Sequence, residues 1–460
     1  MKYRHLNLKK GLGIGILCLS LTNCEELVDI DLPNNQLNTE NIFSDPYNTK
    51  LALSNLYSNL RETPLFQGGT GLNYDLGKYT DELESFKQED YIYLNSLNAS
   101  SSPTHKYWDQ SYANLYQINA FIEGVSASSK IEEATKNVYL GEAYFLRALY
   151  YHYLCQLYGD LPYITTTNYK INSQIAKTPY LQVLDLVEKD LKVALEFLEN
   201  NYRHPDRIYP NKAVVELLLA KNYLLQKRYD LTETYVQKVL DNPLYALETD
   251  LDNVFKKNAH STMWQMSPNE SGASYSATHE ATYFIFDGSV FPTVDVALSL
   301  SLLNSFSPSD TRLQHWIKTY TDGTTSYSHV YKYKNKGVNT DEFSIRFRLE
   351  EAYFIKAEAL AYQEKVNEAV DILNKIRIKR GLTPLPNTLN KADFVTEILS
   401  EYQREFFTEG AHRFLDLKRN NRLQVLETFK PNWEAKHTLL PIPETEILMN
   451  ENLKPQNHGY

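Results

Sequence analysis

The sequence predicts a mainly helical fold in which pairs of amphipathic helices alternate with loop-rich segments. Apolar residues recur at spacings of three and four over long stretches, which is the period of a helix that buries one face. These stretches occur in neighbouring pairs that short breaks separate. Two segments rich in tyrosine and small polar residues lack this period. The pairs favour a short helical solenoid, and an irregular all-helical domain is the alternative.

Residues 1–23 have the features of a secretory signal peptide. The basic start contains Lys2, Arg4, Lys9 and Lys10. The largely apolar run 11–22 follows it and is too short to span the hydrocarbon core of a bilayer. Removal of the signal would delete these positive charges, so the mature chain is expected to be more acidic than the precursor.

The segment Leu21-Thr22-Asn23-Cys24 resembles a bacterial lipobox, in which the cysteine is lipidated and becomes the first mature residue. Asn23 departs from that pattern, because Gly, Ala or Ser usually precedes the cysteine. We expect Cys24 to carry a lipid anchor, which holds a protein at a membrane without a transmembrane helix. The pair Glu25-Glu26 resembles the signal for export to the cell surface, and a solvated tether is the alternative.

Cysteine usage predicts no disulfide framework. Of the three cysteines, Cys18 lies in the signal and Cys24 is the expected lipidation site, which leaves Cys155 without a partner. Cys155 lies within an apolar helical stretch. It is therefore expected to be a small buried hydrophobic residue and not a nucleophile.

The clearest helix is predicted over residues 132–158. One apolar stripe contains Ala143, Leu146, Tyr150, Tyr153 and Leu157. Gly159 is expected to end this helix, and Pro162 prevents it from resuming. A second amphipathic stretch covers about 180–201, and we expect the two helices to pack antiparallel.

Two further helix pairs share a pattern of small residues. One pair is interrupted at 226–228 and the other near Glu364-Lys365. Ala220 and Ala357 stand at equivalent positions, and a small side chain, Thr232 or Ala369, follows each of them twelve residues later. Small residues at these offsets let two helices approach closely, as in tetratricopeptide repeats. A strict repeat period is absent because long insertions separate the units.

Two segments, 63–104 and 245–345, do not fit the helical pattern. The first contains a glycine cluster at 68–71. The second is rich in Ser, Thr, Asn and Tyr, with short strands predicted at 282–286 and 327–333. Loops of this length inside a compact domain are usually functional or disordered, and the aromatic content favours function.

Charge and motif content argue against several classes of function. The chain has 47 basic and 57 acidic side chains, so it offers no general basic surface for nucleic acid. A mean hydropathy of -0.46 argues against a multi-span membrane protein. Because no metal, phosphate or nucleophile motif occurs, we expect no metal, no cofactor and no catalytic residue. Asp250-x-Asp252 begins like a calcium loop but lacks the glycine of that loop.

Several stretches in a fixed order resemble the SusD/RagB family of Bacteroidota outer-membrane lipoproteins. They are Asp31-Leu32-Pro33 with 37–43, Trp108-x6-Leu115-Tyr116-x-Ile118-Asn119, Glu142-Ala143-x-Phe145-Leu146-Arg147-Ala148 with Leu157-Tyr158-Gly159-Asp160-Leu161-Pro162, Arg404-Glu405-x3-Glu409-Gly410-x-His412-Arg413-Phe414-x-Asp416-Leu417-Lys418-Arg419, and Leu440-Pro441-Ile442-Pro443-x2-Glu446. Tyr402 and Thr408 depart from the pattern, because Arg and an aromatic residue are usual at these positions. The order and spacing together carry the resemblance, which runs nearly end to end.

The resemblance implies a mainly α, SusD-like fold with four tetratricopeptide-like helix pairs and an inserted, loop-rich ligand-binding lobe that contains short strands. One domain, 24–460, is expected to follow the signal peptide. Its helical scaffold is placed at about 46–62, 105–243 and 346–420, and its variable insertions at about 63–104 and 245–345. Three charged motif residues, Arg147, Arg404 and Asp416, are expected to be buried and paired, since an unpaired buried charge is costly.

The role that the resemblance implies is capture of an oligosaccharide for a SusC-like TonB-dependent transporter. The protein would be lipid-anchored in the outer membrane and would face the cell exterior. Three alternatives stay open: oligopeptide capture as in the RagB branch, a surface glycosidase that uses loop carboxylates such as Asp75 or Asp81, and a purely structural role in a transporter complex.

A glycan site needs exposed aromatic rings and polar side chains, because sugar rings have apolar faces edged by hydroxyl groups. On composition, the candidate contacts are Asn73, Tyr74, Asp75, Tyr107, Tyr275, Tyr283, Trp316 and Tyr320. Other aromatic residues are expected to pack in the core, namely Trp108, Trp264, Tyr150, Tyr151 and Tyr153.

Overall fold

The computed structural model describes residues 42–271, 274–286 and 294–460. The expected signal peptide, the lipobox cysteine Cys24 and the first family-like stretch up to residue 41 lie outside these residues. Within the described ranges, no helix combines the length and the apolar character needed to cross a bilayer.

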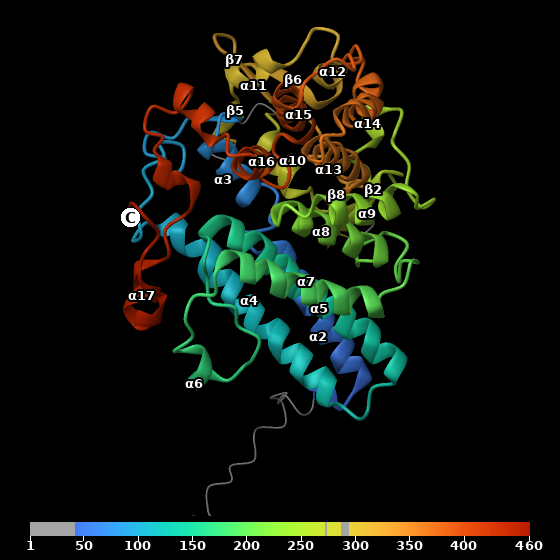
Figure 1. The fold of residues 1–460 in the computed structure, drawn as a ribbon, viewed down its shortest axis with the longest axis vertical. Coiled ribbons are helices and arrows are strands. Elements are labelled where there is room, and N and C mark those ends of the chain that lie inside the picture. The colour runs from blue at the N-terminus through green and yellow to red at the C-terminus, as the bar shows by residue number, and fades with distance from the viewer. Residues whose placement is uncertain (1–41, 272–273, 287–293) are drawn as a thin grey trace, which may run out of the picture.

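A row of helices forms the scaffold, and each helix packs against the next one in the row (Figure 1). In chain order these helices are α2 (Pro46–Glu62), α4 (Ser102–Ala127), α5 (Glu133–Tyr158), α7 (Tyr180–Phe197), α8 (Lys212–Leu225), α9 (Tyr229–Leu240), α13 (Leu349–Tyr362) and α14 (Val366–Lys379). They form the pairs α2 with α4, α5 with α7, α8 with α9, and α13 with α14. The predicted mainly helical, paired architecture is therefore confirmed.

The scaffold follows the local signals in the sequence. Helix α5 ends at Gly159, whose φ of 73° suits glycine. A Cβ on Gly141 of α5 would lie 3.0 Å from the side chains of Phe197 and Leu198, so the start of α5 packs closely on the end of α7. This contact confirms the predicted antiparallel pair. The small residues of the later pairs are fully buried, namely Ala220, Thr232, Ala357 and Ala369.

The remaining helices lie outside this row. They are α3 (Leu72–Tyr79), α6 (Tyr169–Asn172), α10 (His279–Phe284), α11 (Leu300–Ser305), α12 (Arg312–Trp316), α15 (Lys391–Phe406), α16 (His412–Arg419) and α17 (Glu444–Met449), with the 3₁₀ turns η1 (Leu251–Asn253), η2 (Leu423–Thr428), η3 (Ala435–Thr438) and η4 (Glu451–Leu453). Helix α15 packs on α13, α14 and α11, and α16 packs on α15 and α3. These two helices therefore connect the scaffold to both insertions.

Short antiparallel ribbons tie the insertions together. The pairs are β1 (Leu83–Ser85) with β5 (Val296–Leu298), β2 (Thr262–Met266) with β8 (Ser344–Arg348), β3 (Glu270–Ser271) with β4 (Ser274–Tyr275), and β6 (Ile317–Thr321) with β7 (Ser326–Val330). In register, Leu83 faces Leu298 and Thr262 faces Arg348. The β2–β8 ribbon brings the two ends of the long insertion together, and the β1–β5 ribbon joins this lobe to the first insertion.

The two strand predictions had different outcomes. The strand expected at 327–333 corresponds to β7, which is confirmed over its first part. The strand expected at 282–286 is wrong, because α10 occupies most of it. The hydroxyl of Thr278 accepts a hydrogen bond from the Ala281 amide at 3.1 Å and caps this helix, a signal that outweighs the strand propensity of the apolar residues.

The lobe has a hydrophobic core of its own beside the main core of the scaffold. Trp316 lies in the core of the lobe, whereas Trp264 and Trp108 lie in the main core. The core positions expected for Trp108, Trp264, Tyr150, Tyr151, Tyr153 and Cys155 are confirmed. In Figure 1 the lobe, with β5, β6, β7, α11 and α12, lies at the end opposite to α2, α4 and α5.

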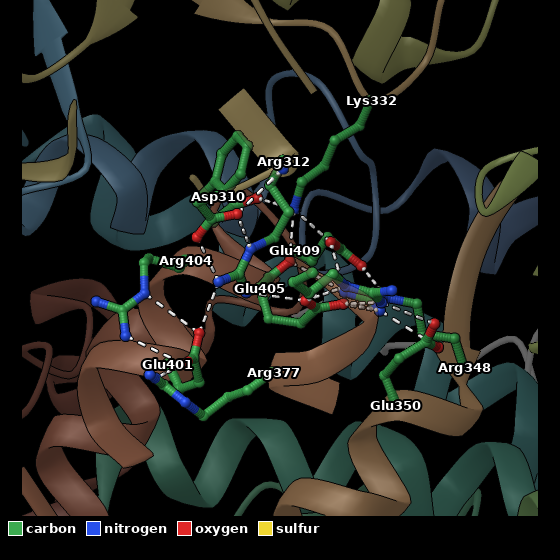
Figure 2. A network of polar contacts seen from close by, with 12 residues as sticks. Asp310, Arg312, Lys332, Arg348, Glu350, Arg377, Glu401, Arg404, Glu405 and Glu409 are labelled. Carbon is green, nitrogen blue, oxygen red and sulfur yellow. Dashed lines mark hydrogen bonds and ion pairs between the residues drawn. The ribbon is translucent and has the colours of Figure 1, made fainter. Parts of the chain in front are cut away.

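A buried ionic network connects the lobe to the scaffold through α15. Both oxygens of Glu405 accept hydrogen bonds, at 3.0 Å from Arg312 of the lobe, 2.8 Å from Arg348 of β8, and 2.7 and 3.0 Å from Arg380 after α14. Figure 2 shows Glu405 between Arg312 and Arg348. Burial alone would raise the pKa of Glu405, but Arg380 and Arg348 hold that pKa well below its usual range.

The pairing expected for three motif residues is confirmed. Arg147 makes two hydrogen bonds of 2.7 Å to the carboxylate of Asp190. Asp416 pairs with His412 at 3.0 Å and with Arg419 at 2.9 Å. Arg404 pairs with Glu401 at 3.2 Å, although it lies at the edge of the network and is partly exposed.

Candidate functional site

A cavity of about 540 Å³ lies where α3, the segment 87–92, the start of α4 and α10 meet, and we name it the α3 cavity. Its lining residues are Thr70, Tyr74, Asp75, Lys78, Lys87, Glu89, Asp90, Tyr91, Ile92, Pro103, Lys106, Tyr283 and Asp295. Both insertions contribute to this wall. The volume is within the range of about 300 to 1,000 Å³ that is typical of small-molecule sites.

Lys78 holds two carboxylates at the base of the α3 cavity. Its ammonium group lies 2.7 Å from Asp90 and 3.6 Å from Asp75, which is one helical turn earlier on α3. Burial alone would raise the pKa of Asp90, but the Lys78 charge and hydrogen bond keep it below its usual value. Asp90 therefore stays ionised and acts as a hydrogen-bond acceptor.

Asp75 joins α3 to the start of α4. It accepts a hydrogen bond of 2.5 Å from the hydroxyl of Tyr107 and forms an ion pair with Lys106. Tyr107 is buried behind the cavity wall, whereas Lys106 is partly exposed. The hydrogen bond fixes the orientation of the carboxylate, because Tyr107 approaches it from inside the protein.

Asp295, like Tyr283, contributes to the wall from the lobe. It accepts a hydrogen bond from the hydroxyl of Tyr74 and pairs with Lys87 at 2.6 Å. Burial, together with the hydrogen bond to Asp295, raises the pKa of Tyr74. Tyr74 therefore stays a neutral donor, and its contact joins α3 to the strand β5 that follows Asp295.

Two tyrosine rings give the cavity an aromatic wall. Tyr91 is 52% exposed, and Tyr283 of α10 is partly exposed. The ring of Tyr283 is nearly parallel to the His279 ring, at an interplanar angle of 12° and a centroid distance of 6.2 Å. Exposed rings of this kind can stack on the apolar face of a ligand while the charged groups bind its polar edge.

The glycine cluster before α3 is required by the close approach of α10. A Cβ on Gly69 would lie 2.3 Å from the carbonyl oxygen of His279 and 2.4 Å from the ring of Tyr283. A Cβ on Gly68 would lie 2.0 Å from the carboxylate of Glu280. Side chains at these positions would push α10 away, so the glycines help to position Tyr283 at the cavity.

Three of the eight candidate residues, Tyr74, Asp75 and Tyr283, line the α3 cavity together. Two others support it from behind. Asn73 accepts a hydrogen bond of 3.1 Å from the Ala411 amide, and Tyr107 bonds to Asp75. The exposed rings expected at Tyr74 and Tyr107 are not observed, because the packing of α3 and α4 leaves these residues only 5% and 3% exposed. A role in ligand contact stays a prediction for all five residues.

The other three candidates lie away from the α3 cavity. Trp316 has no exposed surface and donates to the Leu251 carbonyl oxygen at 3.2 Å, so the surface position expected for it is wrong: the lobe uses it as core. Tyr275 packs edge-on against Phe343. Tyr320 is on β6, with its ring 6.0 Å from that of Phe286.

Tyr320 belongs to an aromatic group that is joined to the α3 cavity through Phe86, the residue before Lys87. Its rings also include Phe86 and Tyr327, whose centroids are 5.3 Å apart. The Phe86 amide donates to the Asp295 carbonyl oxygen at 2.9 Å, and Lys87 and Asp295 line the cavity. These rings could therefore extend the ligand surface from the cavity onto the β6–β7 ribbon.

Sequence reasoning missed most charged residues of the site. Lys78 could have been found from its spacing to Asp75, had a helix been predicted at 72–79. Asp90 and Asp295 carried no local signal. Asp295 reaches the cavity only because β1 pairs with β5, and this pairing joins segments that are more than two hundred residues apart in the sequence.

Among the described residues, one group of carboxylate and histidine side chains is close enough to hold a metal ion, namely Asp250, Asp252 and His315. Asp252 is already bonded to Lys334 and lies 3.0 Å from His315. These contacts account for the cluster, and we assign no metal to it.

Comparisons with known proteins place this geometry in a family context. Residues 29–224 match a family model described as "Starch-binding associating with outer membrane", and residues 280–460 match a model described as "SusD family". The SusD-like protein P2 of Formosa agariphila is 25% identical over 504 aligned positions, which cover 97% of this chain and 98% of that protein.

Solved structures share the fold. A SusD superfamily protein from Bacteroides vulgatus superposes with a TM-score of 0.77 at 18% identity, covering 91% of this chain and 100% of that chain. Surface glycan-binding protein A from Bacteroides uniformis has a TM-score of 0.75 at 18% identity, covering 90% and 99%. Because two models of one family together match most of the sequence and the fold agrees over nine-tenths of it, the chain belongs to the SusD/RagB family.

Proposed function

We propose that this protein is a cell-surface glycan-binding lipoprotein that captures an oligosaccharide at the α3 cavity. The observation that carries the proposal is the combination of exposed Tyr91 and half-buried Tyr283 with fixed ionic groups in one cavity. Rings can stack on sugar faces, whereas Lys78, Asp90 and their neighbours supply donors and acceptors for hydroxyl groups. The glycan-binding relative of the same fold supports this choice of ligand class.

The proposal includes the route to and from the cell surface. Residues 1–23 would be removed, Cys24 would anchor the mature domain 24–460 in the outer membrane, and the cargo would pass to a SusC-like TonB-dependent transporter. In this layout the helices at about 46–62, 105–243 and 346–420 form the scaffold. The insertions at about 63–104 and 245–345 carry the ligand surface. Co-purification of such a transporter with the lipidated protein would test this part.

For Asp90 and Asp81, a role in binding fits better than glycosidase chemistry does. A general acid in a glycosidase needs a carboxyl group whose pKa is raised. The pKa of Asp90 is lowered by Lys78 despite its burial. Asp81, one of the carboxylates expected for an enzyme, is bound by Arg413 through hydrogen bonds of 2.7 and 2.8 Å, and its pKa is also below the usual range despite burial.

Glycan arrays followed by calorimetry would test the ligand class. We expect Tyr91→Ala and Tyr283→Ala each to weaken binding of the best glycan by about tenfold or more, because each removes a stacking surface. Tyr169→Ala is the matched control, since Tyr169 is 80% exposed on α6 and does not line the cavity.

Peptide capture is the second candidate, because paired opposite charges suit the two ends of a peptide. Saturable binding of peptide mixtures, with no binding of glycans, would favour it over our proposal.

A further inference from the structure

A second cavity, of about 720 Å³, shares no lining residue with the α3 cavity. It lies between the C-terminal end of α5, the start of α7, the end of α16 and the C-terminal segment that follows, and we name it the α16 cavity. Its volume is also in the range of small-molecule sites. Neither the proposed glycan site nor the buried ionic network uses it.

Lys418 of α16 is a basic side chain without a carboxylate partner at the wall of the α16 cavity. Its ammonium group donates to the Gln156 carbonyl oxygen at 2.6 Å, near the C-terminal end of α5. An ammonium group has three donors, and no carboxylate in the described part of the chain forms an ion pair with this one. Burial lowers the pKa of Lys418 to about 7. The neighbouring Cys155 thiol supplies no negative charge, because burial raises its pKa.

The contrast with the rest of the same motif makes Lys418 unusual. The other charged side chains of the motif 404–419 have partners of opposite charge within the protein. These pairs are Arg404 with Glu401, Glu405 with Arg380, Glu409 with Arg348, Arg413 with Asp81, Asp416 with His412, and Arg419 with Glu358. The fold therefore pairs the other charged side chains of the motif internally, whereas Lys418 faces the α16 cavity.

The walls of the α16 cavity are apolar beside Lys418. Trp433 and Leu423 are nearly buried there, and Tyr180 is half-buried. The charged residues at the mouth are Asp160, Lys177 and Glu427. Lys177 also lacks a carboxylate partner among the described ion pairs and donates to the Pro455 carbonyl oxygen at 2.5 Å. An apolar pocket with a cation at its wall suits a ligand that has a carboxylate and an apolar face.

We propose that the α16 cavity binds a small organic carboxylate, which pairs with Lys418 and lays its body against Trp433. The inference goes beyond the proposed glycan function, since it concerns a separate site and a charged ligand. Both a sugar acid and an aromatic acid have this chemistry. The two can be distinguished by testing each as a probe.

Calorimetry with glucuronate and benzoate on the mature chain tests the proposal, with glucose as the neutral match for glucuronate. We expect saturable binding of at least one acid and none of glucose, together with a change in tryptophan fluorescence, because Trp433 lines the cavity. Lys418→Met should weaken binding of the acid by about tenfold or more, because it removes a charge-assisted contact. Lys130→Met, an exposed lysine that does not line the cavity, should leave binding unchanged.

Folding and site assignment have separate controls. Lys418→Met replaces a poorly compensated buried charge with an apolar side chain, so its melting temperature should equal or exceed that of the wild type. Tyr91→Ala should leave acid binding intact, which separates failure of this proposal from failure of the glycan site. The proposal is overturned if neither acid binds, if glucose binds to the Tyr91→Ala variant as well as glucuronate does, or if Lys418→Met binds the acids as the wild type does.

Discussion

The α3 cavity and the network around Glu405 use the same kinds of charged side chains in opposite ways. In the network, both oxygens of Glu405 are occupied by guanidinium groups and no exposed surface remains. In the α3 cavity, Asp90 and Asp295 are also paired, but their partners Lys78 and Lys87 line the same cavity. The pairs in the cavity can therefore be shared with a ligand, whereas those in the network cannot.

This difference shows that charge pairing alone does not identify a functional site. The network lies in the buried contact between the lobe, α14 and α15. Because water is excluded there, loss of one partner would leave an uncompensated buried charge. The cavity pairs are built around open volume and lie beside exposed rings. Access, more than the type of residue, separates the structural charges from the candidate binding charges.

The largest effect is expected from breaking the network. Glu405→Gln should reduce the free energy of unfolding by about 3 to 5 kcal/mol, because Arg312, Arg348 and Arg380 lose their shared anion. Urea denaturation followed by circular dichroism would measure it. Glu364→Gln is the matched control, since Glu364 is 70% exposed in its pair with Lys391 and should change stability by less than about 1 kcal/mol. Equal losses in the two variants would show that the network is no more than a set of surface pairs.

Glu82 is a buried carboxyl group that forms no ion pair among the described residues, and it should behave in the opposite way to Glu405. The pKa of Glu82 is raised to about 8 by burial and by the charge of Asp81, and its Oε1 has no hydrogen-bond partner among the described residues. The unfolded chain loses this proton near pH 4.5 and the folded chain only near pH 8, so Glu82 lowers stability as the pH rises between these values.

Glu82→Gln should therefore stabilise the protein at pH 7, on the order of 3 kcal/mol, and by much less at pH 4. Melting curves at several pH values would measure this trend. Glu84→Gln, at a partly exposed neighbouring position, should show no such dependence. A gain that is constant with pH would mean that Glu82 does not hold its proton in the folded state.

The smallest stability effect is expected in the α3 cavity. Asp90→Asn should cost about 1 kcal/mol, because Lys78 keeps Asp75 at 3.6 Å and the amide oxygen can still accept from the Ile92 and Tyr93 amides. Thermal melts would measure stability, and calorimetry would measure the weaker glycan binding that we expect in parallel. A loss as large as that of Glu405→Gln would place Asp90 with the structural charges.

The sequence by itself determined the helix pairs, their close-packed small residues and the end of α5 at Gly159. It also determined that Arg147 and Asp416 would each be paired with an opposite charge inside the protein. These features depend on helical periodicity, glycine geometry and the cost of unpaired charge, which act over short distances along the chain. Three of the eight candidate residues, Tyr74, Asp75 and Tyr283, line the α3 cavity, and their role in ligand contact stays a prediction.

Only the tertiary structure decided which side chains share a site. Asp295 and Lys87 meet because β1 pairs with β5, Trp316 becomes core because the lobe folds around it, and Lys418 reaches a cavity while its motif neighbours are paired. The local sequence around a residue does not specify its long-range neighbours or its exposure to water. Those properties follow from how distant segments pack, and they decide whether a given charge or ring supports the fold or is open to a ligand.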